Sequence, residues 1–103
     1  MQMHRKKRLE IVIEAPIVDR LVALLDKAGV TGYTVTPALA GRGREGKWRR
    51  EGQVTATGQM HVIMSIIDPG RVDEVVEQVY PLVSRHIGIL SVADVDVIRK
   101  DYF

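Results

Sequence analysis

The chain has 103 residues, of which 46% are hydrophobic, and a formal net charge of +2. This length fits one domain with one core, so we expect a single domain over residues 1–103. The absence of cysteine excludes disulfides, thiol nucleophiles and thiolate metal sites, and it favours a cytoplasmic location. No apolar run reaches the roughly 20 residues of a membrane-spanning helix, and the first residues lack the apolar part of a secretory signal. We therefore expect no membrane insertion.

The first half of the chain predicts a strand, a helix and a second strand. Residues 8–14 alternate between apolar and polar side chains, which is typical of a half-buried strand. Apolar side chains recur at helical spacing over residues 15–28, where Pro16 suits the first turn and Gly29 suits the end. Residues 32–38 are rich in β-branched side chains and predict a strand.

The second half predicts the same elements in the order strand, helix, strand. Residues 58–67 are apolar on both faces and predict a central strand. Asp68 and the proline after it predict the cap and first turn of a helix that Pro81 ends or bends early. Residues 87–99 predict a last strand, with a shift of apolar phase at residues 92–95 that indicates a bulge. The order β-α-β-β-α-β predicts an α+β, ferredoxin-like sandwich.

Two segments concentrate positive charge. Residues 41–52 carry five basic side chains and four glycines, and residues 1–7 are expected to form a basic N-terminal tail. Polar loops as long as the first segment are uncommon in compact domains unless they are functional. The segment therefore points to an anion or an acidic partner. Its candidate anion-binding or partner-binding residues are Arg44, Lys47, Trp48, Arg49 and Arg50.

The residues show no catalytic constellation. Ser65 and Ser91 have no evident histidine and carboxylate partners, and the three histidines lack metal-ligand spacing. We interpret His61 as a core or interface histidine, because it lies on an apolar strand. Asp94 and Asp96 share one strand face and are expected to face solvent. We therefore expect no enzymatic activity, no catalytic cofactor and no metal site.

Phosphate recognition and RNA recognition both remain open from the residues alone. The segment Gly41–Gly43 can bring backbone N–H groups close to an anion, although two spaced glycines are a weak motif. An RNA-binding module with the same strand order would stack bases on aromatic side chains of its central strands. Residues 60–63 offer none, and Trp48 lies in the loop. A trimeric ferredoxin-like metal-tolerance or interaction protein is a further alternative.

Residues 29–48 resemble the PII signal-transduction proteins. The matching positions are Gly29, Thr31, Gly32, Thr34, Val35, Thr36, Gly41, Gly43 and Arg44. The resemblance implies a homotrimeric, non-catalytic regulator that binds adenine nucleotides in clefts between subunits. It also implies that a long T-loop, here about residues 39–57, responds to the nucleotide and contacts a target protein.

The resemblance further implies a set of nucleotide-binding residues. Gly32 and Thr34 would meet the adenine, Ile66 would pack on its ring, and the guanidinium of Arg99 would pair with phosphate. The other members lie at the base of the T-loop or just before the last strand. The complete implied set is Gly32, Thr34, Gly41, Arg42, Gly43, Ile66, Ile87, Gly88 and Arg99.

Two departures from the PII pattern narrow the expectation. The glycine- and lysine-rich B-loop of the family is replaced by the short segment 84–88, and Asp101 stands where the family has a second phosphate-binding arginine. Fewer phosphate contacts imply a preference for ADP or AMP over ATP. A short B-loop is similar to that of PII-like proteins linked to inorganic-carbon acquisition. This subgroup implies bicarbonate as a second ligand and a bicarbonate transporter or carboxysome protein as partner, with no nucleic acid expected.

Overall fold

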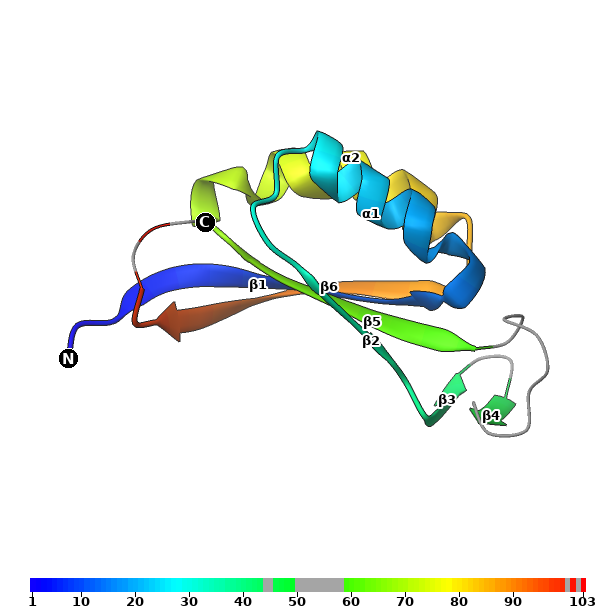
Figure 1. The fold of residues 1–103 in the computed structure, drawn as a ribbon. Coiled ribbons are helices and arrows are strands. Elements are labelled where there is room, and N and C mark those ends of the chain that lie inside the picture. The colour runs from blue at the N-terminus through cyan, green and yellow to red at the C-terminus, as the bar shows by residue number, and fades with distance from the viewer. Residues whose placement is uncertain (44–45, 50–58, 100, 102) are drawn as a thin grey trace.

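The computed structural model describes residues 1–43, 46–49, 59–99, 101 and 103. Both helices lie on one face of a four-stranded sheet, and a two-stranded hairpin projects from it (Figure 1). The elements are β1 (His4–Glu14), η1 (Ala15–Ile17), α1 (Val18–Lys27), β2 (Thr34–Pro37), β3 (Ala40–Gly43), β4 (Gly46–Arg49), β5 (Met60–Ile67), η2 (Pro69–Arg71), α2 (Val72–Ser84) and β6 (Gly88–Val97).

The sheet has the order β2-β5-β1-β6, and all its neighbouring strands are antiparallel. This arrangement confirms the predicted ferredoxin-like fold. Alternate residues of β1 face the helices, so Leu9, Ile11 and Ile13 are almost completely buried. They pack with apolar residues of both helices and of β5 in one core, whose other members are Ile17, Leu21, Leu25, Ala28, Val30, Ile63, Ile67, Val75, Val79, Leu82 and Val83.

The helices begin and end differently from the prediction in two respects. Asp68 precedes η2, but its side chain makes no capping bond; its carboxylate pairs instead with the ammonium of Lys6. Pro81 neither ends nor shortens α2, which continues to Ser84. Because Pro81 is exposed while Leu82 and Val83 are buried, the core contacts of these two residues hold the last turn together.

The basic N-terminal residues are part of the sheet, since β1 begins at His4, and the expectation of a tail over residues 1–7 was wrong for its second half. Two carboxylates of β6 face them across the register. Arg5 Nη1 lies 3.6 Å from Asp94 Oδ2, Arg5 Nε lies 2.8 Å from Asp96 Oδ1, and Lys7 pairs with Asp94. The hydrogen bond and charge of Lys7, with the charge of Arg5, lower the pKa of Asp94, and Asp96 raises the pKa of Arg5.

The predicted bulge in the last strand is absent, because β6 pairs with β1 without a break from Gly88 to Val97. The shift of apolar phase has another cause. Leu90 packs against the core, whereas Asp94 and Asp96 lie opposite Lys7 and Arg5. The pattern therefore reports a change of surroundings along a regular strand.

In the part of the chain that the structure describes, neither helix is long and apolar enough to cross a membrane.

Candidate functional site

An open pocket of about 300 Å³ lies beside the turn that joins α1 to β2. Thr34 pairs with Met64 across the sheet, which brings this turn next to the end of β5. The volume is at the lower end of the range for small-molecule sites. The pocket is lined by Thr31, Gly32, Tyr33, Thr34, Met64, Ser65, Ile66 and Phe103.

The turn that carries the pocket is fixed at three points. Gly29 ends α1 with a φ of +79°, a left-handed conformation that glycine adopts easily. Arg71 donates hydrogen bonds to the carbonyls of Ala28 and Gly29, the second at 2.9 Å. Ser65, which is buried, donates its hydroxyl to the Gly32 carbonyl at 2.6 Å. Ser65 therefore has a structural role that sequence reasoning missed.

The pocket combines hydroxyl groups with apolar walls. Thr31 and Thr34 supply hydroxyls, while Met64 and Ile66 are half-buried apolar side chains. Desolvation, the charge of Asp26 and a hydrogen bond with it raise the pKa of Tyr33 above the ordinary value, at which a phenol is already neutral at physiological pH. A neutral, partly apolar pocket with hydroxyls at its edge suits a flat heteroaromatic ring better than a strongly charged group.

The predicted site residues fall into two groups. Gly32, Thr34 and Ile66 lie together in the pocket. Ile66 pairs with Arg8 of β1, whereas Gly88 pairs with Ile13, five residues further along the strand. At about 3.3 Å per residue, the pocket strand and Gly88 are some 16 Å apart along β1. No single chain brings these two groups to one small ligand.

Arg99 is further from Gly88 than the pocket is. It follows β6, whose Val97 lies nine residues from Gly88, or about 30 Å along an extended strand. The guanidinium of Arg99 is exposed, and its Nε lies 3.5 Å from Asp101 Oδ1. Arg99 thus belongs to the opposite end of the sheet from Ile87 and Gly88.

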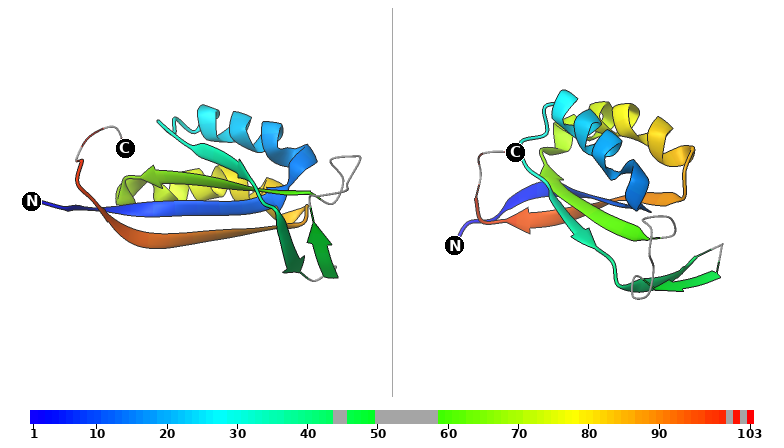
Figure 2. Two further views of the ribbon diagram at one scale, coloured as in Figure 1. Left: turned by 60° about the horizontal axis from the view of Figure 1, so that its bottom comes forward. Right: turned by 45° about the vertical axis from the view of Figure 1, so that its right-hand side comes forward.

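The base of the predicted T-loop forms the hairpin β3–β4, which projects away from the helices (Figure 2). Gly41, Arg42 and Gly43 form an extended strand rather than the turn that a backbone anion nest needs. Arg42 pairs with Lys47 across the hairpin, and both are exposed, which concentrates positive charge there. Trp48 and Arg49 belong to the backbone of β4, while Arg44, Arg50 and the rest of the predicted loop, 50–57, lie outside the described residues.

Gly88 packs more closely against its neighbours than Gly29, Gly32 or Gly70 does. A Cβ atom there would lie 2.5 Å from Ile13 Cδ1 and 2.8 Å from the Val12 carbonyl oxygen. The turn before Gly88 is tied to β1, because His86 Nδ1 lies 3.1 Å from Glu14 Oε1 and the Glu14 N–H donates to the Ile87 carbonyl at 3.3 Å. This packing role of Gly88 was not predicted from the sequence.

Sequence reasoning also missed a cluster beside the pocket. Lys6 has a side chain only 11% exposed, pairs with Asp68 and lies 5.5 Å from the centre of the Phe103 ring. The Asp68 N–H donates to the Phe103 carbonyl at 3.2 Å. The sequence offers one weak signal for this cluster, because Phe103 is the single phenylalanine of the chain.

Among the described residues, no group of three or more histidines and carboxylates could hold a metal ion.

Comparisons with known proteins give a consistent result. The family of the nitrogen regulatory protein P-II matches residues 6–102. CPII, a PII-like protein of Thiomonas intermedia K12 bound to ADP, AMP and bicarbonate, is 28% identical, with a TM-score of 0.85 and coverage of 95% of this chain and 92% of that one. A structure of CPII bound to ADP and bicarbonate aligns at 31% identity, with a TM-score of 0.80 and coverage of 95% and 93%.

A second relative comes from another organism. A putative PII-like signaling protein of Thermus thermophilus is 26% identical, with a TM-score of 0.78 and coverage of 95% of this chain and 94% of that one. No curated protein matches the sequence significantly.

Proposed function

Because the chain belongs to the family of the nitrogen regulatory protein P-II, in its PII-like subgroup, we propose that it is a non-catalytic sensor of ADP or AMP. The nucleotide binds in clefts between three copies of the chain, together with bicarbonate. Its binding orders the T-loop and so controls a partner protein in cytoplasmic inorganic-carbon metabolism.

The separation of the two groups of predicted site residues supports binding between subunits. The pocket residues and Arg99 lie toward one end of the sheet, and Gly41, Arg42 and Gly88 lie toward the other. A second copy of the chain can bring its opposite end against the pocket. Closed, cyclic association of this kind uses two different surfaces of each subunit, and three copies complete it.

The chemistry of the pocket supports an adenine base. Thr31 and Thr34 can hydrogen-bond the edge of the ring, while Met64 and Ile66 pack on its face. The exposed guanidinium of Arg99 can pair with phosphate oxygens. Asp101 lies beside that guanidinium and adds a negative charge, which favours a ligand with fewer phosphates.

The exposed cations of the hairpin support an anion site. Arg42 and Lys47 lie opposite each other on neighbouring strands, so a small anion between them would meet two positive charges. The ligands of CPII include bicarbonate as well as ADP. In this proposal, the anion and the nucleotide phosphates together fix the base of the T-loop.

Thermal unfolding with and without nucleotide tests the proposal. A ligand that binds the folded state stabilises it by about 2.7 kcal/mol per site when its free concentration is 100 times its Kd. ADP is therefore expected to raise the unfolding midpoint, and GDP, which carries the same phosphates on a different base, to raise it much less. Equal shifts with ADP and GDP would contradict an adenine site, and no shift with either would contradict a nucleotide site.

A further inference from the structure

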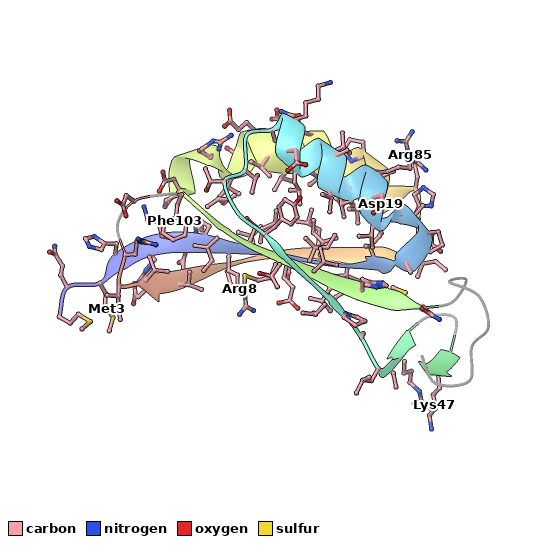
Figure 3. The ribbon with its side chains drawn as sticks, in the orientation of Figure 1. Met3, Arg8, Asp19, Lys47, Arg85 and Phe103 are labelled. Atoms are coloured by element: carbon pink, nitrogen blue, oxygen red, sulfur yellow. The ribbon has the colours of Figure 1, made fainter. Side chains whose placement is uncertain are left out.

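An aromatic ring from a distant part of the chain forms one wall of the pocket. Phe103 lines it together with the turn of Thr31–Thr34 and the end of β5. Figure 3 shows Phe103 beside the start of η2, at the end of the molecule opposite Lys47. The ring is therefore part of the pocket in the structure of a single chain.

Two contacts hold Phe103 in this place. Its carbonyl accepts a hydrogen bond from the Asp68 N–H, which fixes the backbone. The ammonium of Lys6 lies over its ring, at 5.5 Å from the ring centre, and this is the geometry of a cation–π contact. The ring is thus fixed through both its main chain and its side chain.

The burial of Lys6 is further evidence that its contact with Phe103 is part of the fold. A buried ammonium is unfavourable unless it is paired, and the side chain of Lys6 is 11% exposed. Its partners are the Asp68 carboxylate and the Phe103 ring. Because Asp68 contacts both Lys6 and Phe103, the three residues form one unit beside the pocket.

The side chains around the Phe103 ring suit a flat, apolar group in the pocket. Met64 and Ile66 are apolar and half-buried, and Phe103 adds a π surface to the same space. A flat base can pack on these side chains and stack on the ring, and every purine offers a face for such stacking. The phosphates play no part in this contact.

We propose that Phe103 is a further ligand-binding residue that stacks on the base of the ligand, and that Lys6 and Asp68 act as positioning residues for its ring. This inference rests on the proposed nucleotide site and adds to it a residue that binds the base independently of the phosphates. Removal of one stacking partner weakens binding by roughly 5- to 150-fold per base.

Titration calorimetry with adenosine and ADP on four proteins tests this inference. Phe103→Ala is expected to weaken both ligands by about the same factor, in the range of 5- to 150-fold. Phe103→Trp retains affinity, because tryptophan also stacks, whereas Phe103→Leu loses it, because leucine fills space without a π face. Unfolding midpoints without ligand show whether each variant is folded. The wild-type protein is the fourth.

Several outcomes would overturn the inference. If Phe103→Leu and Phe103→Trp retain affinity equally, the ring only fills space and does not stack. If Phe103→Ala binds more tightly than the wild-type protein, the ring of Phe103 obstructs the pocket. A loss for ADP alone would assign Phe103 to the phosphates. If the wild-type protein binds neither ligand, the proposed function fails and this inference fails with it. If the wild-type protein binds both ligands and Phe103→Ala binds them equally well, this inference alone is overturned.

Lys6 has a separate test. Lys6→Met keeps most of the length of the side chain and removes its charge, so it is expected to weaken the binding of adenosine and ADP by a common factor smaller than that of Phe103→Ala. In the double variant with Phe103→Ala, Lys6→Met should cause no further loss, because its effect passes through the ring. A fully additive loss in the double variant would contradict a positioning role.

Discussion

Reversing the charge of Arg99 with Arg99→Glu is expected to weaken ADP binding by about 100-fold, while adenosine binding changes little. The reason is that the guanidinium contacts phosphate in the proposed site, and glutamate both removes that contact and repels the phosphate. Titration calorimetry with the two ligands measures the difference. Arg20→Glu makes the same change of charge on the exposed surface of α1 and serves as the matched control. Equal losses for ADP and adenosine would contradict the role assigned to Arg99.

A second charge reversal tests whether the two ends of the sheet act on one ligand. Arg42→Glu, in the hairpin, is also expected to weaken ADP binding strongly, because Arg42 would meet the phosphates from the neighbouring subunit. When Arg99→Glu and Arg42→Glu chains are unfolded together and refolded as a mixture, about a quarter of the clefts should combine two intact halves. Recovered ADP binding at about that level supports a site between subunits. No recovery would indicate that both residues act within one chain.

Replacement of Gly88 by valine is expected to lower the free energy of unfolding by about 2 to 4 kcal/mol, the largest loss of stability among the substitutions proposed for this chain. A Cβ atom at this position would already meet Ile13 Cδ1 at 2.5 Å and the Val12 carbonyl at 2.8 Å, and a backbone oxygen in a sheet cannot move aside easily. The free energy of unfolding in urea, at fixed protein concentration, measures the effect.

Gly70 provides the control for this substitution. A Cβ atom at Gly70 would meet nothing within 4 Å, so Gly70→Ala should change stability little. If Gly88→Val were as stable as Gly70→Ala, the end of β6 would have to move away from β1 freely. That result would contradict the close packing between these strands.

The fold could be predicted from local patterns, because its core strands and helices each carry a regular apolar period. Ile11 and Ile13 alternate as a half-buried strand does, and the two helices follow prolines at their first turns. The errors arose where a distant partner decides the outcome. Arg5 pairs with Asp96, 91 residues further along the chain, and no local pattern distinguishes that strand from a basic tail.

The candidate site could be predicted only in part, for the same reason. Gly32, Thr34 and Ile66 were predicted from the family resemblance, and they line one pocket because the register of the sheet brings β5 next to the turn. Phe103 and Lys6 were missed, since their contact joins opposite ends of the sequence. Gly88 was assigned to the ligand by resemblance, whereas its surroundings also require a glycine for packing.

The most direct test of the proposed nucleotide site is titration calorimetry of the purified protein with AMP, ADP and ATP, each with and without bicarbonate. We expect ADP and AMP to bind at one site per chain and more tightly than ATP, and we expect the nucleotide affinity to change when bicarbonate is present. Because coupling between two ligands is reciprocal, bicarbonate affinity must change by the same factor when ADP is present. The absence of heat with every nucleotide, at protein concentrations where the trimer forms, would contradict the assignment of the chain as a sensor of adenine nucleotides.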